Sequence, residues 1–193
     1  MEQNSLLVSI LPLVIVIVLS WASIRAIKNT AAKYPPVSSN PDSISGVGGW
    51  LAFLIFSLMF LGPLINAGGT TSSFLSSEQQ FPYLKTNAAW DVYKSVTWWG
   101  FLLTSFISIY AGYSLLRVRN IFVIKRTKII LWLIGPVATL MQGWLLPFLV
   151  FRKLELGSHF ISTIIASFIA ATIWVAYLSK SKRVKATYGK INE

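Results

Sequence analysis

The sequence predicts an all-α membrane protein with five transmembrane helices, an external N-terminus and a cytoplasmic C-terminus. Only 12% of the 193 residues are charged and 54% are hydrophobic, whereas soluble domains carry about 25% charged residues. Apolar runs near the roughly 20 residues that a helix needs to cross a bilayer recur along the chain. They place helices, joined by short loops, at about 5–25, 47–68, 95–116, 129–151 and 160–179.

The positive charges set the predicted orientation. The last apolar run ends in KSKRVK, residues 180–185, and a basic cluster at a helix end is held in the cytoplasm. With this end inside, 13 of the 17 Lys and Arg residues fall in the cytoplasmic segments 25–46, 117–128 and 180–193. The net charge of +11 then reflects topology, and no nucleic-acid partner is expected. We expect these basic residues to lie against anionic headgroups: Arg117, Arg119, Lys125, Arg126, Lys128, Lys180, Lys182, Arg183 and Lys185.

The first apolar run suits either an uncleaved helix or a secretory signal peptide. The residues before it, MEQN, contain no Lys or Arg, and the run exceeds the about 7–15 apolar residues of a signal peptide. Its positive charges follow it instead of preceding it. We predict that residues 1–33 hold an extra N-terminal transmembrane helix, that 34–45 form a Pro- and Ser-rich cytoplasmic linker, and that 46–190 form a four-helix membrane domain.

The longest polar stretch between predicted helices, residues 70–94, contains five aromatic residues. Its later part, 86–97, suits either a short helix lying on the membrane surface or a plain loop with an aromatic belt. The glycines of GVGG, residues 46–49, permit a bend or a close backbone approach before the second helix.

Small residues at four-residue spacing predict faces where membrane helices pack closely, because they let two backbones approach. Each of the last three predicted helices carries such a set. The candidate packing residues are Ser108 and Gly112 in the third helix, Gly135, Thr139 and Gly143 in the fourth, and Ser162, Ala166 and Ala170 in the fifth.

Two polar side chains inside the predicted helices are candidates for a function within the membrane. Asn66 lies in the second helix, and Gln142 lies in the fourth between Pro136 and Pro147. Gln142 suits either contact with a substrate or a hydrogen bond to a neighbouring helix. The chain has no cysteine and one histidine, His159, at the edge of the last helix. We therefore predict no catalytic residue, no metal site and no cofactor.

Three sequence features together resemble a bacterial inner-membrane family. They are GVGGWL at 46–51, Pro63, and IWVAYLSKSKRVKATY at 173–188. The family is catalogued as domain of unknown function 2569 and includes the YdgK-like proteins; the resemblance covers about 46–190. It implies a small multi-pass protein of the bacterial cytoplasmic membrane, and it supplies no catalytic residues.

The sequence therefore favours a non-enzymatic structural or accessory component of a membrane assembly. The alternative is a small oligomeric transporter or channel with a polar site near Gln142. The expected partners are anionic lipid and either further copies of the chain or another membrane protein. In either case we expect a location in the bacterial inner membrane.

Overall fold

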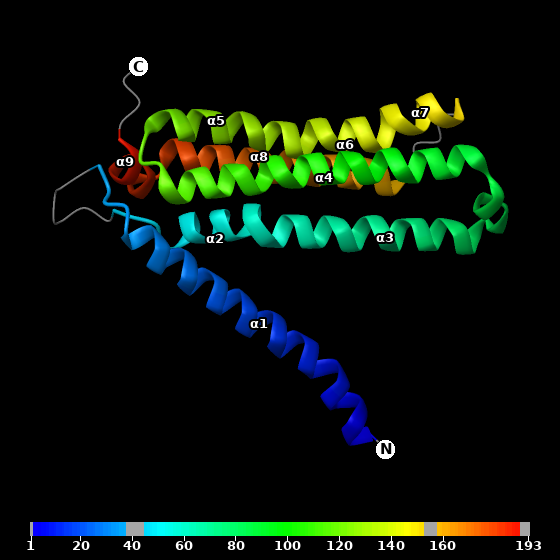
Figure 1. Ribbon diagram of the computed structural model, residues 1–193, viewed down its shortest axis with the longest axis horizontal. Coiled ribbons are helices and arrows are strands. Elements are labelled where there is room, and N and C mark those ends of the chain that lie inside the picture. The colour runs from blue at the N-terminus through cyan, green and yellow to red at the C-terminus, as the bar shows by residue number, and fades with distance from the viewer. Residues whose placement is uncertain (1, 38–44, 153–157, 190–193) are drawn as a thin grey trace.

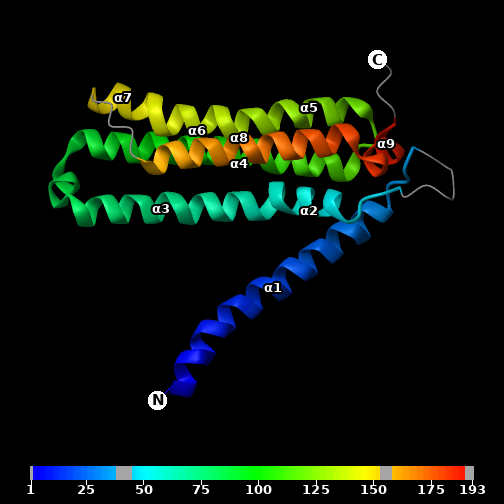
Figure 2. The same ribbon diagram turned by 180° about the vertical axis from the view of Figure 1, so that it is seen from behind.

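The computed structural model describes residues 2–37, 45–152 and 158–189, with side chains described from 14 onward apart from 15, 16, 158 and 159. Within these ranges the protein is a bundle of long helices, and no strand occurs. One N-terminal helix splays away from the bundle, as two opposite views show (Figures 1 and 2). This confirms the predicted all-α fold.

Four helical stretches of the described residues are long and apolar enough to cross a membrane: 50–80, 88–117, 121–151 and 160–180. At 1.5 Å per residue the longest reach about 46 Å, beyond the about 30 Å hydrocarbon core. Their segments are α2 (Trp50–Phe56), η1 (Ser57–Leu61) and α3 (Gly62–Gln80); α4 (Ala88–Arg117); α5 (Ile121–Trp132), η3 (Leu133–Val137), α6 (Ala138–Leu140), η4 (Met141–Leu145) and α7 (Leu146–Phe151); and α8 (Ser158–Lys180).

The first predicted span falls on α1 (Glu2–Ala32), a single helix of 31 residues. Only its last turns join the bundle, through Ile24, Ile27 and Ala31. Further back, side chains such as Val18 and Trp21 are exposed, and α1 diverges from α2 and α3 (Figure 1).

Two stretches that were predicted to lie between helices are helical. Residues 86–97 are neither a surface helix nor a loop, because α3 extends to Gln80 and α4 begins at Ala88, with only the 3₁₀ turn η2 (Pro82–Thr86) between them. The side chain of Asn87 starts α4 by accepting a bond from the Ala89 N–H at 2.9 Å. Likewise Asn120 caps α5, so most of the basic segment 117–128 forms the first turns of that helix.

Prolines produce wide π-helical turns at three places in the bundle, η1, η3 and η4. In η1 the Gly62 N–H donates to the carbonyl of Ser57, five residues back. In this register the carbonyl of Leu58 would pair with Pro63, which has no N–H. The hydroxyl of Ser108 on α4 donates to it instead, at 2.7 Å.

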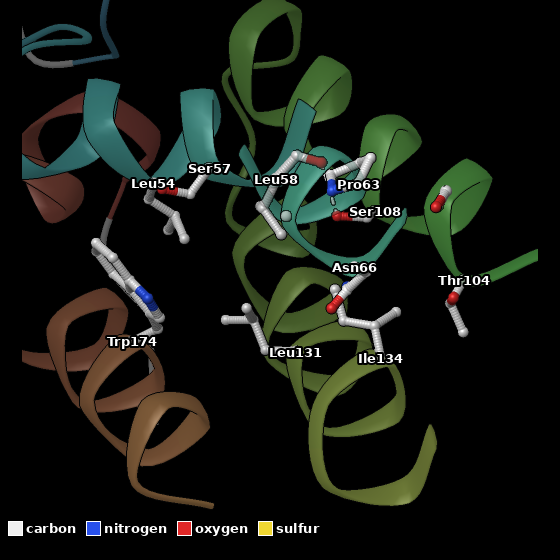
Figure 3. A pocket seen from close by; sticks show the side chains of 12 residues that line it. Leu54, Ser57, Leu58, Pro63, Asn66, Thr104, Ser108, Leu131, Ile134 and Trp174 are labelled. Carbon is white, nitrogen blue, oxygen red and sulfur yellow. Dashed lines mark hydrogen bonds between the residues drawn. The ribbon is translucent and has the colours of Figure 1, made fainter. Parts of the chain in front are cut away.

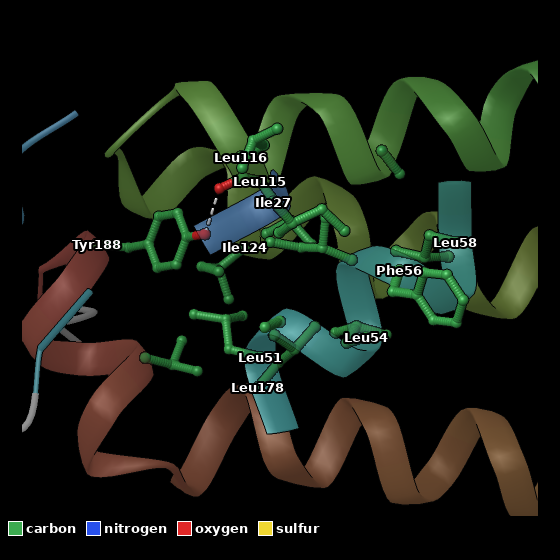
Figure 4. Packing of buried hydrophobic residues seen from close by; sticks show 14 of the residues in the cluster. Ile27, Leu51, Leu54, Phe56, Leu58, Leu115, Leu116, Ile124, Leu178 and Tyr188 are labelled. Carbon is green, nitrogen blue, oxygen red and sulfur yellow. Dashed lines mark hydrogen bonds between the residues drawn. The ribbon is translucent and has the colours of Figure 1, made fainter. Parts of the chain in front are cut away.

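The buried core lies at one end of the bundle, where α4 ends, α5 begins and the short helix α9 (Lys182–Tyr188) packs. We call it the basic end, and the opposite end, where η2 joins α3 to α4, the hairpin end. Figure 4 shows the large apolar side chains that pack together at the basic end, Tyr188 among them. The core includes Leu51, Leu54, Ile55, Leu115, Ile124, Leu178, Val184 and Tyr188.

The two longest motifs of the family resemblance meet at the basic end. The hydroxyl of Thr187 accepts a bond from the Gly46 N–H at 2.9 Å. A Cβ on Gly48 would lie 2.3 Å from Nη1 of Arg183, so the guanidinium packs directly on the glycine and would have to shift for any larger residue. Residues 46–51 and 183–188, far apart in the sequence, therefore form one packed unit.

Candidate functional site

Three neighbouring cavities lie between the helices on the hairpin side of the core. Their volumes are about 120, 100 and 480 Å³. Their walls come from α2–α3, α4, the stretch from α5 to η4, and α8. Asn66 lines all three, and Figure 3 shows its side chain beside that of Ile134 in the first. The cavities thus form one candidate site around Asn66.

The two carboxamides that the sequence singled out separately, Asn66 and Gln142, come together here. Both line the second and third cavities. The side chain of Gln142 lies against α4 at Gly100: a Cβ built on Gly100 would be 3.3 Å from Nε2 of Gln142. Within the described part of the chain neither carboxamide makes a hydrogen bond; Asn66 is exposed and Gln142 is half-buried, so the polar atoms of both are open to the cavities. Each carboxamide offers two N–H donors and an acceptor oxygen, so both can bind a guest molecule.

The main chain of Gln142 adds a further acceptor. The N–H of Leu146 donates to the carbonyl of Met141, and the following residue is Pro147, which has no N–H. The carbonyl of Gln142 is therefore left without an intrahelical donor. This is the situation of Leu58 in η1, except that there the hydroxyl of Ser108 supplies the bond.

Hydroxyl groups make up most of the remaining polar lining. Thr104 donates to the carbonyl of Gly100, Thr139 to that of Gly135, and Thr97 to that of Tyr93, at 2.8 to 2.9 Å. With the proton held by its own helix, each of these oxygens presents lone pairs to the cavity.

Charge is missing from the lining of all three cavities. No Asp, Glu, Lys, Arg or His side chain contributes to any of them. The lining therefore offers hydrogen bonds and aromatic surface, from Phe74, Tyr93 and Phe160 among others, but no group that titrates near neutral pH. In the described residues no three His, Asp or Glu side chains lie together as metal ligands.

Two of the three candidate packing sets lie between helices. Ser108 and Gly112 are buried against η1, and a Cβ on Gly112 would lie 2.5 Å from Met59 Cγ. A Cβ built on Gly135 would lie 3.8 Å from the carbonyl of Ser167 on α8. The ring of Phe160 covers Gly143. Thr139 lines the cavities instead.

The third packing set lies outside the buried contacts of the described chain and stays a prediction for assembly with a second helix. Ser162, Ala166 and Ala170 lie on the exposed side of α8. The buried face of α8 contains Ala171 and Leu178, with Trp174 packed against the core. Small residues make part of this contact, because Gly135 packs against Ser167 and Ala171, and the larger Trp174 and Leu178 make the rest.

The basic residues lie at the basic end in three settings. Arg117 and Arg126 donate to tyrosine hydroxyls. Arg119 is half-buried and donates to the carbonyls of Leu115, Ala31 and Tyr34 and to the hydroxyl of Tyr188. Arg183 packs on Gly48. The lysines are exposed except Lys128, which is half-buried: Lys125, Lys128, Lys180, Lys182 and Lys185.

Sequence reasoning missed the threonines of the site. Thr97 and Thr104 are seven residues apart on α4, and Asn66 and Thr70 are four apart on α3. Such spacings put each pair on one helical face. Polar residues at helical spacing inside the apolar run 95–116 indicate the α4 face, whereas Thr70 lies beyond the run 47–68, so the α3 face depends on the extension of α3 to Gln80.

Comparison with known proteins identifies a family. A sequence model described as "Protein of unknown function (DUF2569)" matches residues 44–189. No curated protein and no solved structure matches the chain.

Proposed function

The chain belongs to the DUF2569 family, and we propose that it binds a small, uncharged, hydrogen-bonding molecule between its helices and passes it across the membrane. The observation that carries the proposal is the pair of unpartnered carboxamides, Asn66 and Gln142, in one uncharged cavity system. In the middle of apolar helices, polar groups without partners are costly. A guest that donates and accepts hydrogen bonds would offset that cost.

The lining also favours one class of guest. An ion entering the membrane loses most of its hydration, and here no opposite charge replaces it. A neutral solute loses far less, and the hydroxyls and amides replace its bonds to water. We therefore propose polyols, amides and similar neutral solutes as the substrate class, and a binding and transport role instead of catalysis.

The wide turns support movement as well as binding. π-helical turns often lie at functional sites, and broken or kinked helices line the binding sites of many transporters. η3 and η4 interrupt the same span on either side of the α6 residue Thr139, and η1 lies one turn before Asn66. These turns let the hairpin side of the bundle shift while the core at the basic end stays packed.

The charge distribution supports an orientation. All nine basic residues expected at the membrane surface lie at the basic end of the bundle. By the positive-inside rule we propose that this end faces the cytoplasm of a bacterial inner membrane and that the hairpin end faces outward.

Solute entry into vesicles tests the function. The protein is reconstituted into liposomes, and swelling is followed by stopped-flow light scattering in inward gradients of urea and of glycerol. We expect faster swelling than in protein-free liposomes. Asn66→Leu with Gln142→Leu should return the rate to the protein-free value, because the cavity loses both carboxamides.

Gln79→Leu is the matched control, because Gln79 is an exposed carboxamide of α3 that lines none of the cavities. It should keep the wild-type rate. Equal swelling for wild type and for the double variant, both eluting as folded protein, would reject the transport proposal.

A second candidate function is an accessory component of a membrane assembly. It is favoured by the exposure of Ala166 and Ala170 on α8, where a second helix could approach closely. Ala166→Leu with Ala170→Leu should then shift the oligomeric state or release a co-purifying partner. Ile165→Leu, a conservative change at an exposed position of α8, is the control; unchanged assembly in the double variant rejects this candidate.

A further inference from the structure

A cluster of tyrosine and arginine side chains lies on the outer surface of the basic end, away from the cavities. Tyr110, Tyr113 and Arg117 stand at i, i+3 and i+7 on one face of α4. Arg117 donates from Nε to the hydroxyl of Tyr34 at 2.8 Å, and from Nη1 to that of Tyr113. Arg126, from α5, donates to the hydroxyl of Tyr110 at 2.8 Å. We call these five residues the tyrosine–arginine cluster.

The rings also hold the guanidinium groups in place. Cζ of Arg117 lies 5.0 Å from the ring centre of Tyr113 and 5.7 Å from that of Tyr34, and Cζ of Arg126 lies 4.6 Å from that of Tyr110. A guanidinium stacked on aromatic rings keeps a fixed plane. The guanidinium groups of Arg117 and Arg126, whose N–H donors form two planar forks, are therefore oriented before any ligand binds.

The two positive charges of the cluster have no counter-charge among the described side chains. Among the described side chains the carboxylates are Glu78 and Asp91, and both pair with Lys94 at the hairpin end. Each guanidinium has five N–H donors, of which Arg117 uses two here and Arg126 one. The unused donors suit a phosphate, whose oxygens accept paired bonds from arginine.

An apolar strip continues from the cluster toward the middle of α4. Phe106 is 70% exposed and Leu103 is 62% exposed, and they stand four and seven residues before Tyr110 on the same face. A soluble anion would need only the two arginines. A lipid needs a charged site at the level of the headgroups and an apolar track below it, and α4 provides both.

We propose that the tyrosine–arginine cluster is a binding site for one anionic phospholipid, with the phosphate between Arg117 and Arg126 and an acyl chain along Phe106 and Leu103. The site differs from the general attraction of basic residues to anionic membranes. That attraction acts on every exposed lysine of this end, whereas the cluster presents two oriented forks. It requires only that the basic end lies at a headgroup layer, whichever side of the membrane that is.

Lipid titration of the full-length protein tests the site. The purified, delipidated protein in neutral detergent is titrated with phosphatidylglycerol, and bound lipid is counted by native mass spectrometry. Arg117→Gln with Arg126→Gln should weaken the first binding event at least about tenfold, because both charge-assisted contacts are lost. Lys125→Gln with Lys182→Gln is the matched control, since it removes two exposed charges from the same end outside the cluster, and should change the affinity less than about twofold.

Further measurements separate a specific lipid site from diffuse attraction and from a soluble-anion site. Equal weakening in both double variants would show diffuse attraction and overturn the proposal. Competition by inorganic phosphate as effective as that by phosphatidylglycerol would make the site a soluble-anion site and also overturn it. If the arginine-to-glutamine protein does not fold, Arg117→Lys with Arg126→Lys keeps the charge and removes the forks. An unchanged affinity in that variant contradicts the proposal, and a clear loss supports it.

Discussion

The basic and hairpin sides of this bundle are built from the same long helices but are packed in opposite ways. At the basic end Leu51, Leu115, Ile124 and Tyr188 are at most 2% exposed, and α9 closes the end. On the hairpin side the space between the same helices is occupied by cavities lined with hydroxyls and amides. A small membrane bundle can thus hold its fold at one end and leave a polar chamber at the other.

The difference arises from where small residues and prolines lie. Ser108 and Gly112 let α4 approach η1 closely. Nearer the hairpin end, Pro136 and Pro147 lie within or just after the wide turns of the fourth span. The close approach of α4 to η1 gives the core, and the widened turns η3 and η4 of the fourth span line the chamber. Changes at the basic end should therefore affect stability, whereas changes on the hairpin side should affect binding.

The largest loss of stability is expected from Tyr188→Ala. Its side chain is 2% exposed, and its hydroxyl donates to the carbonyl of Leu115. Truncating such a buried aromatic residue costs about 3–5 kcal/mol. Tyr83→Ala, at a position 65% exposed near the hairpin end, should cost less than about 0.5 kcal/mol. Thermal unfolding in detergent measures both, and equal shifts would contradict the division of the bundle.

Glycine-to-alanine changes should alter the free energy of unfolding in opposite directions on the two sides of the bundle. At Gly112 a Cβ would lie 2.5 Å from Met59 Cγ and 3.3 Å from the carbonyl of Ile55, so Gly112→Ala should cost about 1–3 kcal/mol. At Gly68, on α3, no atom lies within 4 Å, so Gly68→Ala should stabilise the helix by about 0.5 kcal/mol. The same unfolding assay reads both, and destabilisation by both changes would count against the comparison.

Alkaline pH should loosen the basic end through Tyr188. Burial raises the pKa of this phenol well above its usual value of 10.0. The stability that this group contributes is therefore complete below pH 10 and falls as pH rises toward its raised pKa, by about 1.4 kcal/mol per pH unit. Tyr188→Phe should remove this contribution to the decrease of stability with pH. Unfolding midpoints between pH 9 and about 11 give the comparison, and identical slopes would rule the account out.

The smallest effects compare two polar side chains. Ser108→Ala leaves the carbonyl of Leu58 without its donor and should cost about 1 kcal/mol. Gln142→Leu removes no described hydrogen bond and should change stability by less than about 0.5 kcal/mol, although it should impair solute entry. A larger stability loss at Gln142 than at Ser108 would make Gln142 a packing residue and weaken the proposed site.

The sequence predicted the parts of this structure that depend on local composition. Apolar runs located the four membrane-length helices, and the rarity of polar groups within those runs singled out Asn66 and Gln142. Their meeting in one cavity could not be predicted, since it depends on which faces of α3 and of the fourth span turn inward. The exposure of Ser162, Ala166 and Ala170 in the single chain could not be predicted for the same reason, because a stripe of small residues does not reveal which side of α8 turns toward the bundle.

Helix ends and wide turns were also beyond the sequence patterns. Residues 70–94 are more polar than the apolar runs, yet α3 and α4 extend into them. Asn87 caps the start of α4, and Trp90 and Lys94 donate hydrogen bonds to Glu78 on α3. In the same way Asn120 caps the start of α5 within a basic segment. Prolines predicted disturbed backbone, but not that Leu58 would find a donor on α4 while Gln142 would not. These outcomes depend on neighbours that only the folded bundle supplies.

Cysteine accessibility tests the contrast between the two sides most directly, because the chain has no cysteine of its own. Single cysteines are placed at Asn66 and Thr139 in the chamber, at Leu115 in the core, and at Leu103 on the lipid-facing surface. They are then treated with a small, polar thiol reagent in membranes. Only a thiolate in contact with water reacts readily. We predict rapid modification at Asn66 and Thr139, slowed at Thr139 by saturating urea or glycerol, and none at Leu115 or Leu103; protection of Asn66 and Thr139 to the level of Leu115 would contradict a polar chamber that is open to water.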